Sequence, residues 1–320
     1  MLCWQEASRI PTRVLGRTGL VVSRLGLGTA EIGFAYGLGK RSLPDEKEAI
    51  RLLNIAVGMG ITYFDTAAFY GLAEERIGKS GIAKNPGVVI GTKCGSFLDK
   101  GERPESAEVE RRIRKEVEDS LRILKLDVLP LLMLHGGSAE DITGRELTDI
   151  LQKFKDEGKA LHVGISTRGE EAALAAVSGG FFEVVQTAYS IIDQRMSRRV
   201  LPLAYSNGVG IINRSVLLKG VLSGAVLNYP PILQPLASVA SQVYDLAARY
   251  GVDLPTFAIR FALSNPFIST ILIGTNNLGH LSSAVRAAER GPLPYGLVAE
   301  METLALSDPN QVDPARWPKF

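Results

Sequence analysis

Short apolar runs alternate with longer amphipathic stretches along most of this chain, and this alternation restricts the fold more than any other feature. "RLGLGTA" near residues 24–30 is the first run. Seven more follow, rich in β-branched residues: "ITYFDT", "GVVIGTK", "DVLPLLMLH", "ALHVGIS", "FEVVQT", "VGIINRS" and "STILIGT". Near-continuous apolar runs are typical of strands buried on both faces of a parallel sheet. Between them, "SAEVERRIRKEVEDSLRILK" places Val109, Ile113 and Val117 at helical spacing.

Eight such strands, without a linker or a shift in composition, predict a (β/α)8 TIM barrel that spans residues 1–320 as a single domain. The competing architecture, a doubly wound open sheet, lacks the expected G-x-G-x-x-G after its first strand. The leading "RVLGRTGLVVSRLG" predicts an N-terminal β-hairpin. From about residue 306 the chain is polar and rich in proline, which predicts an irregular surface tail. Trp317 is expected to anchor this tail, with a pocket lid as the alternative.

Composition narrows the kind of partner. The 36 basic and 34 acidic residues leave a net charge of +2, so no overall field favours nucleic acid or a membrane, and a small molecule is expected instead. Cys3 and Cys94 lack the paired spacing of a zinc site, so no metal is predicted. Glu6 and Arg9 interrupt the position of a signal peptide, and no apolar run approaches the roughly 20 residues that span a bilayer. We expect a soluble cytoplasmic protein. Its oligomeric state stays open.

Ionisable side chains close three consecutive predicted strands. Asp65 ends "TYFD", Lys93 ends "VVIGTK" and His135 ends "VLPLLMLH", while Tyr70 follows the first of these strands on its loop. The carboxyl ends of barrel strands converge on one mouth, where catalysis occurs. Buried charges cost several kcal/mol unless they are paired, so packing alone does not explain this set. The pattern predicts an active site.

The chemistry of these four residues is coherent. A free tyrosine has a pKa of about 10, and an adjacent ammonium such as Lys93 lowers it. Asp65 would keep Lys93 protonated, and His135 could hydrogen-bond a substrate oxygen or relay a proton. The set suits protonation of a carbonyl oxygen while another group attacks the carbon. A Schiff-base aldolase using Lys93 is an alternative, but it needs an unpaired, deprotonated lysine.

The segment "GITYFDTAAFYGLAEERIGKSG" resembles the signature of the aldo-keto reductases. "VVIGTK", "DVLPLLMLH", "GKALHVGIST", "VVQTAYSIID" and "STILIGTNNLGHLSSAV" follow in family order, so that the resemblance runs from about residue 13 to 290. It implies an NAD(P)(H)-dependent oxidoreductase in which hydride passes between nicotinamide and an aldehyde, ketone or sugar carbonyl, or the matching alcohol. The tetrad would be Asp65, Tyr70, Lys93 and His135, with Tyr70 as general acid/base. A non-catalytic, nucleotide-sensing subunit is the alternative, because the potassium-channel β subunits share this fold.

The resemblance also implies which residues contact the cofactor. In chain order they are Gly28, Thr29, Asp65, Ser166, Thr167, Gln186, Arg214, Ser215, Leu217, Lys219, Gly274, Thr275, Asn276 and His280. Two positions depart from the family pattern: Thr167 stands where asparagine is common, and Arg214 stands where many members stack a tyrosine on the nicotinamide. A planar guanidinium can also stack.

The loop "IGTNNLGH" lacks the lysine or arginine with which many NADPH-dependent members grip the 2′-phosphate. Family habit still favours NADP(H) slightly, with NAD(H) as the alternative. The substrate itself is not predicted. Six residues suggest a partly aromatic pocket with room for polar groups: Ile32, Phe34, Tyr36, Phe69, Phe97 and Tyr229. Cys94 is expected to fill space in the barrel.

Overall fold

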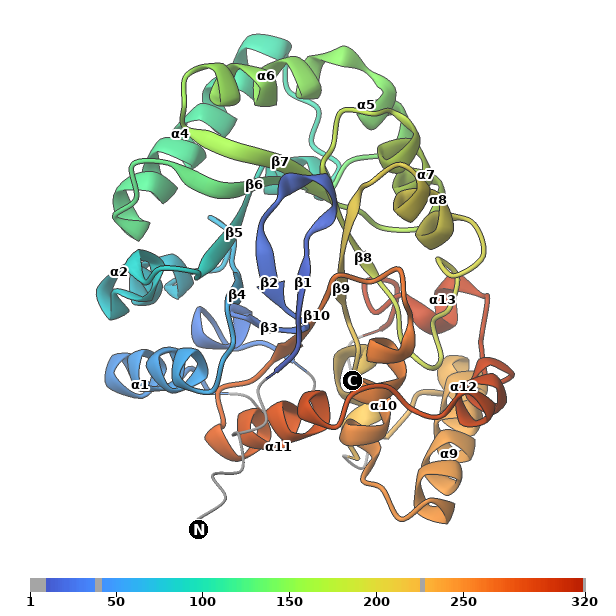
Figure 1. Cartoon of the computed structure of the whole chain (residues 1–320). Coiled ribbons are helices and arrows are strands. Elements are labelled where there is room, and N and C mark those ends of the chain that lie inside the picture. Colours follow the sequence, from blue (N-terminus) through green and yellow to red (C-terminus); the bar gives the residue numbers. More distant parts are fainter. Residues whose placement is uncertain (1–9, 38–41, 225–227, 319–320) are drawn as a thin grey trace.

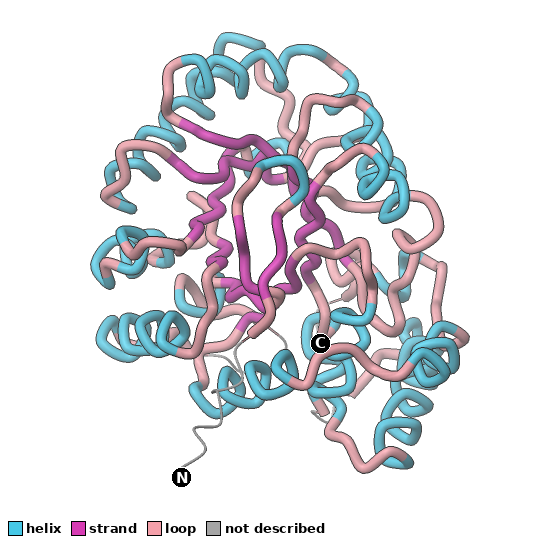
Figure 2. Tube along the Cα trace, in the orientation of Figure 1, coloured by secondary structure: helices cyan, strands magenta, loops and turns pink. Residues whose placement is uncertain are grey.

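A closed barrel of eight parallel strands, surrounded by helices, forms the centre of the protein (Figures 1 and 2). The structure is a computed structural model that describes residues 10–37, 42–224 and 228–318. Neighbouring strands follow the order β10-β3-β4-β5-β6-β7-β8-β9. Their bounds are β3 Leu25–Gly28, β4 Tyr63–Asp65, β5 Val89–Cys94, β6 Leu129–His135, β7 Ala160–Ser166, β8 Val184–Ala188, β9 Gly210–Arg214 and β10 Thr270–Gly274. The predicted (β/α)8 barrel is confirmed.

Amphipathic helices cover the outside of the barrel. Those of the described residues are α1 Glu46–Gly58, α2 Ala73–Ser80, α3 Ser96–Asp99, α4 Ser106–Leu124, α5 Ala139–Thr143, α6 Arg145–Asp156, α7 Glu170–Ser178, α8 Val200–Ser206, α9 Gln234–Arg249, α10 Leu254–Ser264, α11 Leu278–Glu289, α12 Tyr295–Glu302 and α13 Pro309–Val312. Helix α4 buries Val109, Ile113 and Val117, as its spacing predicts. Asp45 and Asp253 cap α1 and α10 by accepting hydrogen bonds from backbone N–H groups.

The predicted N-terminal hairpin is present and lies across the amino-terminal end of the barrel. Strands β1 (Thr12–Val14) and β2 (Val21–Ser23) pair antiparallel. The turn between them docks on the start of β9, where Arg17 N donates to Gly208 O at 2.7 Å. Gly16 has φ +56°, and a Cβ there would lie 2.1 Å from Gly210 N, so only glycine permits this contact. The hairpin closes one end of the barrel and leaves the other for the site.

Strand register brings the carboxyl ends of the strands to one mouth. Gly28 of β3 lies beside Asp65 of β4 and Gly274 of β10. Ser166 of β7 lies beside His135 of β6 and Gln186 of β8. Residues that are far apart in sequence thus become neighbours around one opening.

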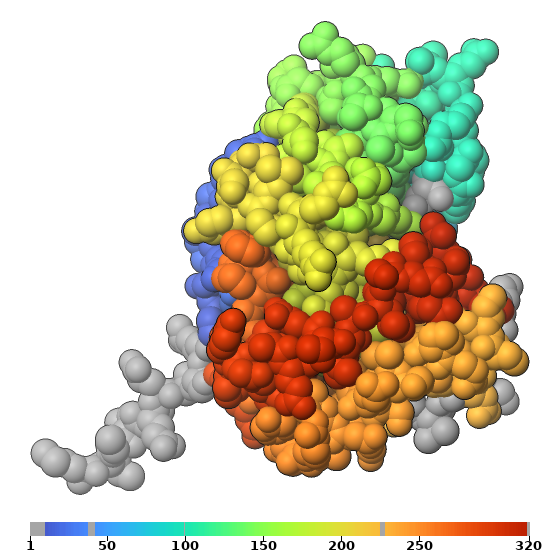
Figure 3. All heavy atoms as spheres, turned by 90° about the vertical axis from the view of Figure 1, so that its right-hand side faces the viewer, coloured from blue at the N-terminus to red at the C-terminus, as the bar shows by residue number. Residues whose placement is uncertain are grey.

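The C-terminal tail is more ordered than the expected irregular segment. Residues 309–312 form α13, and Gln311 and Val312 are buried. The side chain of Gln311 accepts from Leu236 N and donates to Ile232 O, which fixes the tail to the start of α9. Trp317 Nε1 donates to Gln311 O at 3.2 Å, so Trp317 anchors the tail locally, as predicted. Figure 3 shows the red C-terminal residues packed against the orange α9. None of the described helices combines the length and apolar character needed to span a membrane.

Candidate active site

Asp65 and Lys93 form a buried ion pair at the mouth of the barrel. They lie near the carboxyl ends of the neighbouring strands β4 and β5, and only 4% and 1% of their surfaces are exposed. Nζ of Lys93 lies 2.6 Å from Oδ2 of Asp65 and donates a second hydrogen bond to Thr66 O at 2.9 Å. Pairing offsets the desolvation that would otherwise exclude both charges from the interior.

Tyr70 and His135 complete the group of four. Tyr70 lies on the loop between β4 and α2, and Lys93 Nζ is 5.0 Å from the centre of its ring. The rings of Tyr70 and His135 lie 5.6 Å apart, nearly perpendicular at 79°. Nδ1 of His135 is buried and has no hydrogen-bond partner among the described residues. The structure therefore brings together the four residues that the strand ends predict.

Burial changes the expected protonation of Tyr70. Its pKa is raised because burial, the largest cause, outweighs the opposing effect of the Lys93 ammonium. The expectation of a lowered pKa is wrong in net direction, although the effect of Lys93 has the expected sign. Burial lowers the pKa of Lys93, but Asp65 and Tyr70 reverse this and raise it. Tyr70 is thus protonated and Lys93 charged at neutral pH.

His135 is neutral near pH 7, because its surroundings disfavour the charged imidazole. Burial, followed by the charges of Lys93, Arg214, Arg168 and Lys100, lowers its pKa from 6.5 to about 3. A neutral imidazole can hydrogen-bond a substrate oxygen. The other expected role of His135, the relay of a proton, stays a prediction, and burial disfavours the charged imidazole.

Gln186 joins two sides of the mouth. Its Nε2 donates to Oδ1 of Asp65 at 2.6 Å, and its Oε1 accepts from Ser166 Oγ at 3.1 Å. Oδ1 of Asp65 also accepts from Tyr63 OH at 3.4 Å, whereas Oδ2 meets Lys93. Sequence reasoning assigned Gln186 to the cofactor alone and missed its contact with Asp65. The position of Gln186 in β8, the strand opposite β4 in the closed barrel, could have indicated this contact.

Gly28, Thr29 and Gly274 form the edge of the mouth beside Asp65. The backbone N–H and Oγ1 of Thr29 both donate to Asp65 O at 2.9 Å, so Thr29 is buried and holds the end of β4. Gly28 is partly exposed and Gly274 is exposed. With no side chains, these neighbouring strand ends leave room for a ligand to lie against the backbone.

Arg214 ends β9 and leads into a strained loop. Its Nη2 donates to Thr167 O at 2.8 Å, and its Nη1 donates to Ser215 Oγ at 3.3 Å. Ser215, Leu218 and Lys219 have φ values of 63°, 44° and 54°, a region that residues other than glycine rarely occupy. Each such residue costs on the order of 1 kcal/mol, and this kind of strain concentrates at functional sites. Leu217, in the same loop, packs against the core.

The loop after β10 uses its polar groups to start α11. Oγ1 of Thr275 accepts from Asn277 N at 3.0 Å, and Oδ1 of Asn277 accepts from Gly279 N and His280 N at 2.8 and 3.1 Å. Asn277 is therefore the N-cap of this helix. Asn276 is exposed and donates to Ser42 O at 3.3 Å. His280 is exposed as well.

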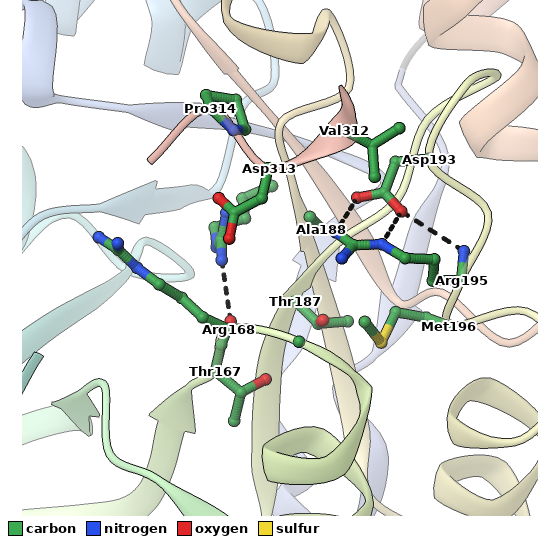
Figure 4. Close-up of a pocket in the computed structure, with 12 residues that line it drawn as sticks. Thr167, Arg168, Thr187, Ala188, Asp193, Arg195, Met196, Val312, Asp313 and Pro314 are labelled. Atoms are coloured by element: carbon green, nitrogen blue, oxygen red, sulfur yellow. Dashed lines mark hydrogen bonds and ion pairs between the residues drawn. The ribbon is translucent and has the colours of Figure 1, made fainter. Parts of the chain in front are cut away.

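A small pocket beside the mouth was not predicted (Figure 4). The ends of β7, β8 and β9 and the C-terminal tail form its wall, which is lined by Thr167, Arg168, Gly169, Thr187, Ala188, Asp193, Arg195, Met196, Arg214, Val312, Asp313 and Pro314. Nε and Nη2 of Arg195 donate to the two carboxylate oxygens of Asp193 at 2.7 and 2.8 Å. Residues 312–314 of the tail line this pocket and Trp317 does not, so the anchor expected of Trp317 is supported and the alternative of a pocket lid is not.

Several aromatic rings gather around Tyr70. Phe34 is 5.5 Å from Tyr36, 6.3 Å from Phe69 and 6.1 Å from Tyr70, measured between ring centres. Phe97 and Ile32, expected in the pocket, are instead fully buried in the core, and Tyr229 is partly buried. Burial raises the pKa of Cys94, so this residue is an unreactive thiol that fills space, as predicted.

Comparison with known proteins identifies the class. Residues 24–305 match the sequence profile described as "Aldo/keto reductase family". L-galactose dehydrogenase of Arabidopsis thaliana is 29% identical over 93% of this chain and 91% of its own length, and NADH-specific methylglyoxal reductase of Escherichia coli is 30% identical over 81% and 88%. An aldo-keto reductase from Bacillus halodurans, AKR11C1 in its holo form, superposes with a TM-score of 0.79 at 25% identity, covering 97% and 100% of the two chains.

Fold, site and relatives together define an oxidoreductase that uses a nicotinamide cofactor and acts on carbonyl or alcohol groups. The profile matches most of the sequence, so the assignment extends to the whole barrel. The chain belongs to the aldo/keto reductase family. Among its described residues, no group of three or more histidines, cysteines or carboxylates is placed to hold a metal ion.

Proposed function

We propose that this enzyme interconverts a small aldehyde, ketone or sugar carbonyl and the matching alcohol, with Tyr70 as general acid in reduction and general base in oxidation. One observation supports this most directly: the buried Asp65–Lys93 pair, 2.6 Å apart, places an ammonium 5.0 Å from the Tyr70 ring. That arrangement supplies a proton donor together with a fixed charge beside it.

Each of the four residues has a separate task. Tyr70, whose raised pKa keeps it protonated, gives its proton to the carbonyl oxygen. Lys93 then stabilises the phenolate that is left, because its ammonium is fixed before the reaction begins. Asp65 holds Lys93 in its charged form. His135, neutral and partly buried, orients the substrate oxygen by a hydrogen bond.

The residues of the mouth suit a nicotinamide dinucleotide. When bound, the nicotinamide supplies or accepts the hydride. Gly28 and Gly274 offer bare backbone, and Ser166 and Gln186 offer groups for a carboxamide. The flat side chain of Arg214 could lie against a ring, and Thr167, whose carbonyl oxygen accepts from Arg214, would hold that side chain in place. Further away, the strained loop after Arg214 presents backbone and polar groups suited to phosphates.

Those phosphate contacts would come from two loops. Ser215, Leu217 and Lys219 would hold the pyrophosphate. Thr275, Asn276 and His280, at the N-terminus of α11, would hold the adenosine part.

Weak discrimination between NADPH and NADH follows from the loop after β10. Residues 274–280 include no lysine or arginine to pair with a 2′-phosphate. A relative of similar length in Escherichia coli is an NADH-specific reductase. We therefore expect both cofactors to be accepted, with NADP(H) favoured only slightly.

Small polar carbonyl compounds are the proposed substrates. The names of two relatives refer to L-galactose and to methylglyoxal. The mouth of this chain combines Tyr36 and Phe69, both exposed, with polar groups, which suits a sugar or a short aldehyde.

The test is a panel of aldehydes, ketones, sugars and alcohols with both cofactors, followed by absorbance of the reduced nicotinamide. Tyr70→Phe should lower the rate by about 10²–10⁴-fold while cofactor affinity, measured by fluorescence titration, stays unchanged. Turnover of this variant at the wild-type rate would show that Tyr70 is not the proton donor.

Two rival functions have different signatures. A nucleotide-sensing subunit would bind cofactor but turn over no carbonyl compound. A Schiff-base aldolase would be trapped by borohydride on Lys93, but the pairing of Lys93 with Asp65 and its raised pKa disfavour the free amine that this reaction needs.

A further inference from the structure

Tyr63 is a buried phenol one layer deeper in the barrel than the ion pair. It lies two residues before Asp65 on β4, and alternate residues of a strand face the same side, so both side chains point into the barrel. The residue is fully buried, and its hydroxyl donates to Oδ1 of Asp65 at 3.4 Å. A phenylalanine would fill the same space, so the hydroxyl needs a reason other than packing.

The two strands beside β4 leave room for this phenol. They carry Gly26 on β3 and Gly91 on β5. A Cβ at Gly91 would lie 2.2 Å from the hydroxyl oxygen of Tyr63, and a Cβ at Gly26 would lie 2.9 Å from Cδ1 of the same ring. Both distances are too short for a real side chain. Glycine therefore stands at both positions where the ring and the hydroxyl need the space.

The other surroundings of the hydroxyl are apolar. Tyr63 belongs to a buried cluster whose remaining members are Leu15, Val22, Val89, Leu131, Met133, Val184, Ile212 and Leu272. Burial of a hydroxyl among such side chains is unfavourable unless it is hydrogen-bonded. Burial, followed by the charge of Asp65, raises the pKa of Tyr63 well above its ordinary value. The hydroxyl therefore stays protonated and acts as a donor toward Asp65.

We infer that Tyr63 is a positioning residue whose hydroxyl supports the negative charge of Asp65 while Tyr70 gives up its proton; this rests on the proposed function. In the resting site Oδ2 of Asp65 meets Lys93 and Oδ1 accepts from Gln186, each at 2.6 Å. When negative charge develops on Tyr70, Lys93 is shared between Asp65 and the new phenolate. Asp65 then loses part of the compensation that a buried charge requires.

The length of the bond from Tyr63 suits this task. At 3.4 Å it is longer than the 2.5–2.7 Å of a strong O–H···O⁻ hydrogen bond, so it can shorten as Lys93 turns toward Tyr70. An interaction that strengthens only in the transition state raises kcat and leaves substrate binding unchanged. The hydroxyl of Tyr63 should therefore affect the chemical step alone.

Tyr63→Phe tests this inference because it removes the hydroxyl and keeps the ring. Asp65 retains its hydrogen bond from Gln186, so the fold is preserved. We expect the single-turnover rate, followed by absorbance of the reduced nicotinamide, to fall about three- to tenfold, less than for loss of a full-strength hydrogen bond to a charged group. KM and cofactor affinity should stay unchanged. The solvent deuterium isotope effect should rise, because proton transfer becomes slower.

Tyr189→Phe is the matched control. Tyr189 directly follows β8, is buried and stacks on Phe261 with ring centres 5.5 Å apart, so this change also removes one buried phenolic hydroxyl. It should alter neither the rate nor the isotope effect. An unchanged rate in Tyr63→Phe, or a lower rate with an unchanged isotope effect, overturns the inference while the proposed function stands. No turnover of any carbonyl compound by the wild type contradicts the proposed function instead.

A double-mutant cycle shows whether Tyr63 acts through Asp65. Asp65→Asn removes the charge that the hydroxyl supports, so adding Tyr63→Phe to this variant should change the single-turnover rate less than about twofold. Equal fold losses from Tyr63→Phe in the wild type and in Asp65→Asn would mean that the hydroxyl acts independently of the carboxylate, and would overturn the inference.

Discussion

His135 should make the folded protein less stable in mild acid, and this effect can be isolated. Its pKa is 6.5 in the ordinary state and about 3 in the folded protein, with burial as the main cause. Between these values the unfolded chain binds a proton that the folded chain does not. The stability contributed by neutral His135 is therefore complete above pH 6.5 and is lost as pH falls toward 3.

The magnitude follows from the same two values. Within the window the free energy of unfolding changes by about 1.4 kcal/mol per pH unit for one proton. Between pH 8 and pH 4.5 the accumulated loss is about 2.7 kcal/mol, because the unfolded chain takes up its proton over the 2 units between pH 6.5 and pH 4.5. His135→Gln keeps a polar side chain without the titration, so its stability should fall less steeply over this range by that amount. Carboxylates that titrate in the same range contribute equally to both proteins and cancel in the difference.

Urea unfolding of wild type and His135→Gln from pH 8 to pH 4.5 measures the difference. His280→Gln is the control because it removes an imidazole from an exposed position. The chain has three histidines, so ring signals in an NMR titration report on His135 directly. Parallel stability curves for wild type and His135→Gln, or a His135 signal that titrates near pH 6.5, would refute the reasoning.

Two further predictions concern the ion pair and the cofactor. Lys93→Met leaves Asp65 buried without its cation, so we expect a loss of about 3–5 kcal/mol in unfolding free energy and a shifted pH optimum, with part of the stability restored in the double variant Asp65→Asn/Lys93→Met. Unchanged stability and an unchanged pH profile would separate Lys93 from Tyr70. Asn276→Arg should strengthen NADPH binding and leave NADH binding unchanged, as measured by fluorescence titration. A wild type that already prefers NADPH strongly would mean that another cation, such as Lys219, reaches the 2′-phosphate.

The barrel and the four residues at its mouth could be predicted because both depend on local pattern. Strands buried on both faces read as continuous apolar runs, and the few charged residues that end them stand out. Once the barrel is assumed, Asp65, Lys93 and His135 must converge, since the carboxyl ends of all strands share one mouth. The barrel fold alone is therefore enough to bring these three residues to the same mouth.

Features that depend on tertiary packing could not be predicted in this way. The hydrogen bond from Gln186 to Asp65 joins β8 and β4, which are not neighbours, so it forms only because the closed barrel is narrow enough. The net direction of the Tyr70 pKa depends on how deeply loops bury it, which outweighs the nearby charge. The sequence of the tail is polar and rich in proline, yet Val312 is buried because α13 packs on α9. The composition of the tail does not indicate that it packs against another helix, so its order could not be predicted.

The division of the site along the chain has a consequence for how the enzyme could be recombined. The proposed acid–base group lies on β4, β5 and β6 and their loops, whereas most of the proposed cofactor contacts lie between β7 and α11. A chimera joined in the turn between α6 and β7 would inherit its proton chemistry from one parent and most of its nucleotide handling from the other. The hydrogen bond from Gln186 to Asp65 crosses that junction, so compatibility between parents would be decided there.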